Sequence, residues 1–201
     1  AALHAVPVIA VLRGLVPDDA TAVGLAAAAG GLRAVEVTMD SPGAGDAIAA
    51  LVAAAPTGVA VGAGTVVSAA DLEHAVTAGA RFLVSPHLDG DLVRRAAALE
   101  VPFIPGVASP TELHAAVAAG ASMVKLFPAA ALGQGYLAAL RGPYPQVAVM
   151  VSGGIAIDTI ASWLQAGATA VGIGMATIDR HPDHVQEVAS KLVGLAAEFT
   201  R

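Results

Sequence analysis

The sequence alternates from one end to the other between short runs rich in valine and isoleucine and longer stretches rich in alanine and leucine. The short runs are typical of buried strands, and the longer stretches, which open on helix-start residues, are typical of helices. Eight strands are predicted, at residues 6–13, 34–39, 59–66, 82–86, 103–107, 123–128, 148–152 and 170–174. Their nearly continuous hydrophobicity favours a parallel sheet covered by helices.

Helix boundaries between these strands are marked by a few residue types. Ser109 precedes Pro110 and stands three residues before Glu112, which combines an N-cap, a proline at the first helical position and a glutamate that can reach back to the cap. Ser68 and Ser41 open similar segments. Helix ends are predicted at the alanine–glycine pairs 78–79, 119–120 and 166–167.

Eight strand–helix units in 201 residues leave about 25 residues for each unit, which is close to the lower size limit of an eight-fold barrel. We therefore expect an α/β fold in which residues 1–201 form a single-domain (β/α)8 TIM barrel. The alternative is an open, doubly wound sheet, since hydrophobic periodicity does not show whether a sheet closes.

The composition argues against several classes of partner. A net charge of −6, with no basic cluster beyond Arg94 and Arg95, gives no footprint for nucleic acid or an anionic membrane. The mean hydropathy is +0.73, yet the apolar runs are short and bounded by charges, so no membrane span is predicted. The absence of cysteine and of a signal-peptide pattern predicts a cytoplasmic location. The scattered histidines match no zinc motif, and we expect neither a metal nor a cofactor.

Lys125 is the best sequence clue to chemistry. It lies within the apolar run at residues 123–128, in a chain whose one other lysine is Lys191. An ammonium group among apolar neighbours is costly to bury, so it must find a partner or lose its proton. A lysine desolvated in this way is a candidate nucleophile toward a carbonyl carbon. The alternative is a lysine whose ammonium group reaches solvent from the strand end or binds phosphate.

The ends of the other predicted strands supply further candidates, because functional side chains of such barrels lie where the strands end. In addition to Lys125, these positions hold Arg13, Glu36, Thr65, Pro86, Phe127 and Ser152. One by one they have structural explanations: Glu36 can serve as an ion-pair partner of Lys125 or Arg13, and Thr65 can satisfy backbone groups. Their convergence on one rim of an apolar barrel predicts a site.

Glycines lie where the last two predicted strands end, in Ser152-Gly153-Gly154 and Gly172-Ile173-Gly174. Glycine lets backbone N–H groups approach an anion, and the loops after strands seven and eight are where barrels often bind phosphate. A phosphorylated substrate is therefore predicted, with Met175 next to this site. The alternative is that the glycines only form tight turns.

Seven segments, taken in order, resemble one known family. They are residues 10–13, 35–38, 62–66, 84–87, 104–107, 124–128 and 152–155, which read AVLR, VEVT, GAGTV, VSPH, IPGV, VKLFP and SGGI. In this order and spacing they resemble the class I aldolases that cleave 2-keto-3-deoxy-6-phosphogluconate (KDPG), a family that includes 4-hydroxy-2-oxoglutarate (KHG) and phosphogalactonate aldolases. The resemblance covers almost the whole chain.

The resemblance implies a (β/α)8 barrel, usually a homotrimer, that uses no metal and cleaves a 2-keto-3-deoxy (phospho)sugar acid or 4-hydroxy-2-oxoglutarate to pyruvate and an aldehyde. It assigns the Schiff base to Lys125 and the acid/base role to Glu36. It also implies substrate-binding residues: Arg13 and Thr65 for the pyruvyl part, Pro86 and Phe127 along the walls, and Ser152, Gly153, Gly154, Gly174 and Met175 near the phosphate.

Three positions depart from the family pattern. Asp40 stands where many phosphogluconate-cleaving members carry arginine, Ser152 replaces threonine, and Met175 replaces a serine whose hydroxyl can bind phosphate. The segment Asp40-Ser41-Pro42 looks more like the phosphogalactonate branch. Two alternative functions stay open: a non-covalent phosphate-binding barrel such as an epimerase, isomerase or synthase, and an aldolase-derived barrel that serves as an assembly scaffold.

Overall fold

The computed structural model, which describes residues 2–175 and 179–199, contains one sheet of parallel strands. Its strand order is β5-β4-β3-β2-β1-β9-β8-β7-β6. The strands are β1 (Val8–Leu12), β2 (Ala34–Thr38), β3 (Ala60–Gly64), β4 (Leu83–Val84), β5 (Phe103–Ile104), β6 (Gly106–Val107), β7 (Met123–Leu126), β8 (Ala148–Ser152) and β9 (Ala170–Gly174). Each predicted strand is found, generally with shorter bounds.

Closure of the sheet depends on Pro105. This residue divides the predicted strand 103–107 into β5, which pairs with β4, and β6, which pairs with β7. Proline has no N–H to donate, so the ladder is interrupted there. Its carbonyl oxygen nevertheless accepts the N–H of Lys125 at 2.8 Å. The two ends of the sheet therefore meet within one chain segment, which confirms the closed barrel and argues against the open, doubly wound alternative.

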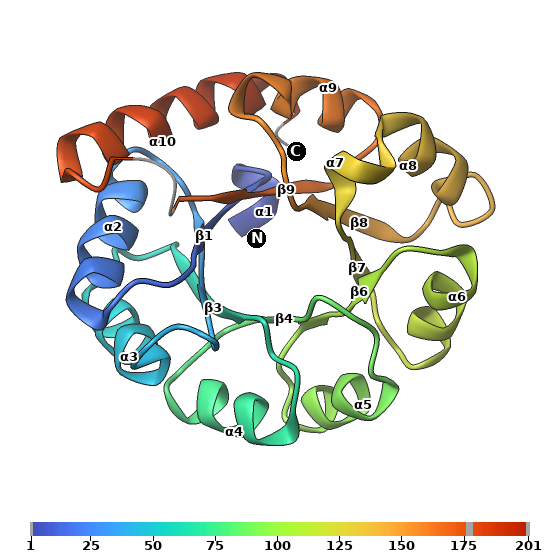
Figure 1. Ribbon diagram of the computed structural model, residues 1–201, viewed down its shortest axis with the longest axis horizontal. Coiled ribbons are helices and arrows are strands. Elements are labelled where there is room, and N and C mark those ends of the chain that lie inside the picture. Colours follow the sequence, from blue (N-terminus) through green and yellow to red (C-terminus); the bar gives the residue numbers. More distant parts are fainter. Residues whose placement is uncertain (1, 176–178, 200–201) are drawn as a thin grey trace.

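Helices form the outer layer around this barrel (Figure 1). They are α1 (Ala2–Ala5), α2 (Pro17–Ala29), α3 (Ala44–Ala54), α4 (Ala69–Thr77), α5 (Gly90–Ala98), α6 (Pro110–Ala118), α7 (Ala129–Leu132), α8 (Gln134–Arg141), α9 (Ile160–Gln165) and α10 (Pro182–Ala196), with short 3₁₀ turns η1 (Ile157–Thr159) and η2 (Ala197–Phe199). The exception is α1, which appears within the ring in Figure 1 and lies at the end where the strands begin. Within the described residues, no helix is long and apolar enough to cross a membrane.

The predicted helix caps are confirmed at Ser68 and Ser109, whose side chains accept the N–H groups of Asp71 and Glu112. The prediction at Ser41 is wrong. Helix α3 begins after Gly43, and the Ser41 hydroxyl instead accepts the N–H of Gly14 at 2.8 Å. Ser41 therefore ties the loop after β2 to the loop after β1.

Alternation along each strand sends one set of side chains to the helices and the other into the barrel. Val35 and Val37 of β2 belong to the main core between sheet and helices. The interior set begins, at the end where the strands start, with an apolar cluster of Ile9, Ala34, Phe82, Val84, Ile104, Met150 and Ala170. Two residues beyond Ala34 the interior position is Glu36, so the chemistry-bearing residues lie above this apolar layer.

Candidate active site

A cavity of about 540 Å³ opens at the end of the barrel where the strands finish. Nine of the predicted site residues line it: Arg13, Thr65, Pro86, Lys125, Phe127, Ser152, Gly153, Gly154 and Gly174. They come from six different strands or the loops that follow them. The structure thus brings together residues that are spread over most of the sequence.

Lys125 lies on β7 and is only 4% exposed. Its Nζ atom sits over the ring of Phe127, 4.9 Å from the ring centroid, and forms no hydrogen bond or ion pair with the described residues. Burial lowers the pKa of Lys125 below its ordinary value of 10.5, and the charge of Arg13 lowers it further, while Glu36 opposes the shift. The environment therefore favours the neutral amine, which is the nucleophilic form.

Glu36 lies on β2, 1% exposed, beneath the cavity rather than on its wall. Both of its carboxylate oxygens are buried without a hydrogen-bond partner among the described residues. Burial raises the pKa of Glu36, although the charges of Lys125 and Arg13 lower it. Gly64 is what makes room for this side chain, because a Cβ there would lie 2.0 Å from Glu36 Oε1.

The two shifts move the pKa values of Lys125 and Glu36 toward each other, since one is lowered and the other raised. Burial makes the neutral amine and the protonated carboxyl easier to reach than they would be in water. Such a pair suits addition of an amine to a carbonyl group, in which the nitrogen attacks and a nearby acid helps to expel water.

Arg13 follows β1 and stands at the rim of the cavity. Its Nη1 forms an ion pair with Asp40, and its Nη2 donates a hydrogen bond of 2.8 Å to Thr65 Oγ1. Thr65 has φ of +53°, a value that a β-branched residue seldom adopts. Three neighbouring strand ends are thus joined through one guanidinium group.

The loop after β8 supplies a different kind of group. Gly153 and Gly154 have φ of +94° and +75°, and a Cβ at Gly153 would lie 2.8 Å from the Phe127 ring. Within the described residues, neither N–H donates a hydrogen bond. Successive backbone N–H groups that face a cavity form a concave site for an anion.

Met175 is not brought to this site. Its side chain is buried in the main core, and its N–H donates to the carbonyl oxygen of Val11 at 2.9 Å. Met175 therefore offers neither a side-chain donor nor a free N–H group. Residues 176–178, which follow Met175, lie outside the described residues.

Gly172, predicted together with Gly174, also lines the cavity. Two other lining residues were not predicted from the sequence, Val11 and Ile155. A signal for Val11 was present, because it stands two residues before Arg13 and so points to the same side of its strand. Ile155 follows the pair of glycines directly.

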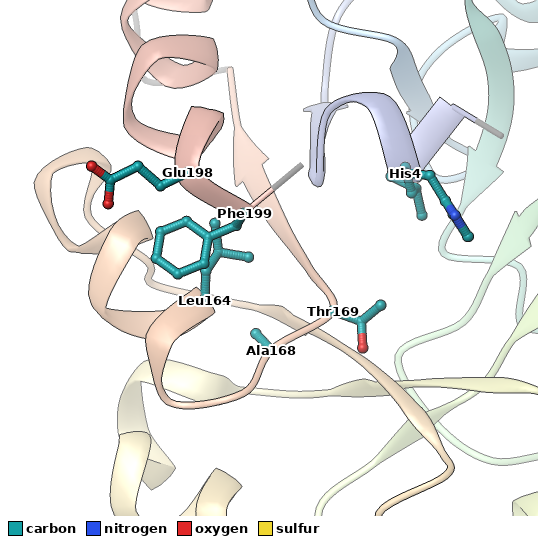
Figure 2. A pocket seen from close by; sticks show the side chains of 7 residues that line it. His4, Leu164, Ala168, Thr169, Glu198 and Phe199 are labelled. Atoms are coloured by element: carbon teal, nitrogen blue, oxygen red, sulfur yellow. The ribbon is translucent and has the colours of Figure 1, made fainter. Parts of the chain in front are cut away.

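The opposite end of the barrel has a separate cavity of about 220 Å³ next to α1, η2 and the start of β9. Figure 2 shows His4 and Glu198 on opposite sides of it, with Leu164, Ala168 and Phe199 between them. His4 and Glu198 are both exposed, and no lysine lines this cavity. It lacks the desolvated amine that carbonyl chemistry requires.

A closed parallel barrel with a buried lysine and carboxylate at the ends of its strands has the architecture of the class I aldolases. The family model for KDPG and KHG aldolases matches residues 1–190 of the chain. The chain belongs to the KDPG and KHG aldolase family. Membership confirms the predicted family and the predicted enzyme class, a carbon–carbon lyase.

Individual relatives agree with this assignment. The chain is 36% identical to the 2-dehydro-3-deoxy-6-phosphogalactonate aldolase of Escherichia coli K12 over 169 residues, 84% of this chain and 82% of the relative. The KDPG aldolase of Legionella pneumophila, solved with pyruvate captured at low pH as a covalent carbinolamine intermediate, superposes with a TM-score of 0.82 at 32% identity, covering 100% of this chain and 97% of that one.

A third similar structure is a designed assembly. It is a cube-shaped, porous protein cage made by fusing symmetric oligomeric domains, with a TM-score of 0.90 and 32% identity over 96% of this chain and 73% of that one. The barrel of this family is thus found in a symmetric oligomer.

Proposed function

We propose that this chain is a class I aldolase that reversibly cleaves a 2-keto-3-deoxy-6-phosphosugar acid to pyruvate and a phosphorylated aldehyde, with Lys125 as the Schiff-base residue. The observation that carries the proposal is Lys125 itself, a buried amine without a counter-ion contact that lines the one cavity where the other predicted residues of the described chain meet. Its pKa is lowered by burial, as amine catalysis near neutral pH requires.

The first half of the reaction builds the imine. The neutral Nζ of Lys125 attacks the C2 ketone of the substrate and gives a carbinolamine. Glu36, whose pKa is raised by burial, donates a proton as water leaves and the protonated imine forms. Glu36 lies beneath the cavity wall, so this proton moves through a bound water or after a small side-chain rotation.

The second half breaks the carbon–carbon bond. The C3–C4 electron pair moves toward the positively charged imine nitrogen, which yields an enamine, while the C4 hydroxyl loses its proton to the Glu36 carboxylate and becomes the aldehyde. Glu36 then returns a proton to C3 of the enamine, and hydrolysis of the resulting imine releases pyruvate and restores the amine. The same groups serve the reverse direction.

Substrate binding is divided between the two sides of the cavity. Arg13 and Thr65 hold the carboxylate next to C2, and Pro86 and Phe127 exclude water from the amine. The free N–H groups of Gly153 and Gly154 receive the phosphate at the other end of the substrate, with Ser152 and Gly174 beside them. This arrangement supports a phosphorylated substrate even though Met175 contributes no donor.

Release of pyruvate tests the proposal directly. The experiment compares 2-keto-3-deoxy-6-phosphogluconate and 2-keto-3-deoxy-6-phosphogalactonate with their two unphosphorylated counterparts. Pyruvate is measured in an assay coupled to lactate dehydrogenase. The phosphorylated acids should show kcat/KM values about tenfold higher or more, as expected for loss of charge-assisted hydrogen bonds. Equal values would remove the phosphate site, and no pyruvate from any of the four compounds would refute the cleavage reaction.

We further propose that the chain is a single domain and acts as a homotrimer in the cytoplasm. The trimer is supported by the family resemblance, and the location by a chain without cysteine. Light scattering distinguishes a trimer from the much larger closed particle that a scaffold role would produce.

A further inference from the structure

Asp40 occupies the rim of the cavity without lining it. It follows β2 by two residues, its side chain is 47% exposed, and it forms an ion pair with Arg13, whose side chain is 50% exposed. Arg13 and Asp40 are 27 residues apart in the sequence, so this contact exists only because β1 and β2 are neighbours in the barrel. The mechanism above gives Asp40 no role.

A guanidinium group at this place needs an anchor. Arg13 is followed by Gly14, which has φ of +67° and open space around its Cα, so the chain itself does not restrain the side chain. An arginine side chain loses rotamer entropy when it is ordered. If Asp40 and Thr65 order the side chain before substrate arrives, the substrate carboxylate does not have to bear that cost when it binds.

The backbone beneath Asp40 is held rigidly. Ser41 is buried, accepts the N–H of Gly14 at 2.8 Å, and shares a hydrogen bond of 2.9 Å with the buried hydroxyl of Thr38. The N–H of Met39 donates to the carbonyl oxygen of Gly64 at 2.8 Å, which ties the same loop to the end of β3. Asp40 is therefore presented from a fixed loop rather than from a free one.

The remaining donors of Arg13 are available to a ligand. A guanidinium group has five N–H bonds, of which one is directed to Asp40 and one to Thr65. Thr65 lines the cavity and is held at a positive φ, an unusual backbone state of the kind that clusters at ligand sites. The two contacts orient the guanidinium plane between the rim and the cavity.

We propose that Asp40 is a positioning residue, which holds Arg13 against Thr65 and thereby sets the affinity of the cavity for the carboxylate of the 2-oxo acid. This inference rests on the proposed function for the identity of the ligand. Asp40 touches no reacting atom and acts through Arg13 alone, so its removal should weaken carboxylate binding and leave the chemical step unchanged.

A double-mutant cycle tests the inference with oxamate, whose carboxylate matches that of pyruvate and whose amide carbon forms no imine. Calorimetric dissociation constants would be measured for the parent, D40A, R13A and the double variant. We expect D40A to weaken binding about threefold to tenfold, R13A to weaken it more, and the double variant to equal R13A. Asp40→Glu, which keeps the charge, should lie between the parent and D40A.

Glu73→Gln is a matched control, because Glu73 pairs with Arg95 at 55% and 50% exposure, away from the cavity. It should leave oxamate binding unchanged. The inference is overturned if D40A has no effect, tightens binding, or weakens binding equally in the R13A background, and also if the parent binds no oxamate. Failure of the proposed function is a different result: the parent would form no borohydride-trapped pyruvate adduct, while the oxamate cycle would still decide the role of Asp40.

Discussion

The two ends of the barrel are built from the same parallel strands but treat charge in opposite ways. Where the strands begin, His4, Arg81 and Glu198 are exposed, and the interior behind them is the apolar cluster that contains Phe82 and Met150. Where the strands finish, Lys125 and Glu36 are buried within the barrel without hydrogen-bond partners among the described residues. The ionisable groups named at the first end remain in contact with water, whereas Lys125 and Glu36 at the second end are buried away from it.

This difference indicates that the active-site end contains features that lower the free energy of unfolding but serve the reaction. Burying an unpaired charge is unfavourable, and a β-branched residue with positive φ adds backbone strain. Lys125, Glu36 and Thr65 concentrate such features in one place. We therefore expect substitutions of Lys125 and Glu36 to remove activity while sparing or raising stability, and substitutions at the opposite end to lower stability while sparing activity.

The largest effect is expected for Lys125→Met, which keeps the length of the side chain and removes the amine. Cleavage should fall by about 10⁴-fold or more, since the covalent step is lost. The fold should be retained, with unchanged circular dichroism and an equal or higher melting temperature, because a buried polar group without a hydrogen-bond partner among the described residues has been removed. Lys191→Met, on the exposed surface of α10, is the matched control and should retain full activity.

Glu36→Gln should produce the next largest effect. Turnover should fall by about 10²- to 10⁴-fold, the usual contribution of a general acid or base. Some imine formation with pyruvate should remain, because the lysine is intact. Glu198→Gln, in the cavity at the other end, should leave turnover unchanged. Full turnover in the Glu36 variant would remove this residue from the mechanism.

The same Glu36→Gln variant makes a prediction about stability and pH. Because the folded pKa of Glu36 is raised above 4.5, its contribution to stability is fully present below 4.5 and is lost as the pH rises through the folded pKa. Glutamine cannot ionise. The gain in unfolding free energy of the variant over the parent should therefore grow as the pH rises, as measured by urea denaturation, and a constant difference would contradict the pKa shift.

A smaller effect is expected for Gly153→Ala, with Gly120→Ala as its control. Gly120 lies between α6 and β7 at the opposite end of the barrel. Both glycines have positive φ, +94° and +104°, so both variants should lose about 1 kcal/mol from backbone strain. A Cβ at residue 120 meets nothing within 4 Å, whereas one at residue 153 collides with the Phe127 ring. Only Gly153→Ala should also lower kcat/KM, and equal kinetics in the two variants would argue against a role for this loop.

The smallest effect is expected for Thr169→Val, where the strands begin. Thr169 Oγ1 accepts the N–H of Val149 at 3.1 Å, so the variant should lose about 1 kcal/mol of unfolding free energy. Its kcat and KM should match those of the parent. Altered kinetics would show that the two ends are not independent.

The sequence predicted the strand positions and the convergence of the cavity residues because both follow from local periodicity and from the geometry of a barrel. Ser41 shows the limit of this reasoning. A serine before a proline can cap a helix or hold a neighbouring loop, and the choice depends on Gly14, which is 27 residues away. The ion pair of Asp40 with Arg13 also joins residues that are 27 apart in the sequence. It too depends on the pairing of β1 with β2 and not on local sequence.

Met175 and Pro105 show two further limits. Gly174 is the last residue of β9 and Met175 is the next residue, but alternation places Gly174 at the cavity and the side chain of Met175 toward the helices. The N–H of Met175 is already bonded to the carbonyl oxygen of Val11. Pro105 was placed within a strand, yet its missing N–H divides that strand into β5 and β6. One-residue differences of this kind are decided by tertiary pairing rather than by local composition.

The most direct test of the account is to incubate the parent protein with pyruvate and sodium borohydride and to locate the reduced adduct by peptide mass mapping. The account predicts one pyruvyl adduct on the peptide that contains Lys125 and none on Lys191, at pH values below the ordinary lysine pKa of 10.5. No adduct, or one on Lys191 alone, would contradict the claim that the buried amine of this barrel performs covalent chemistry.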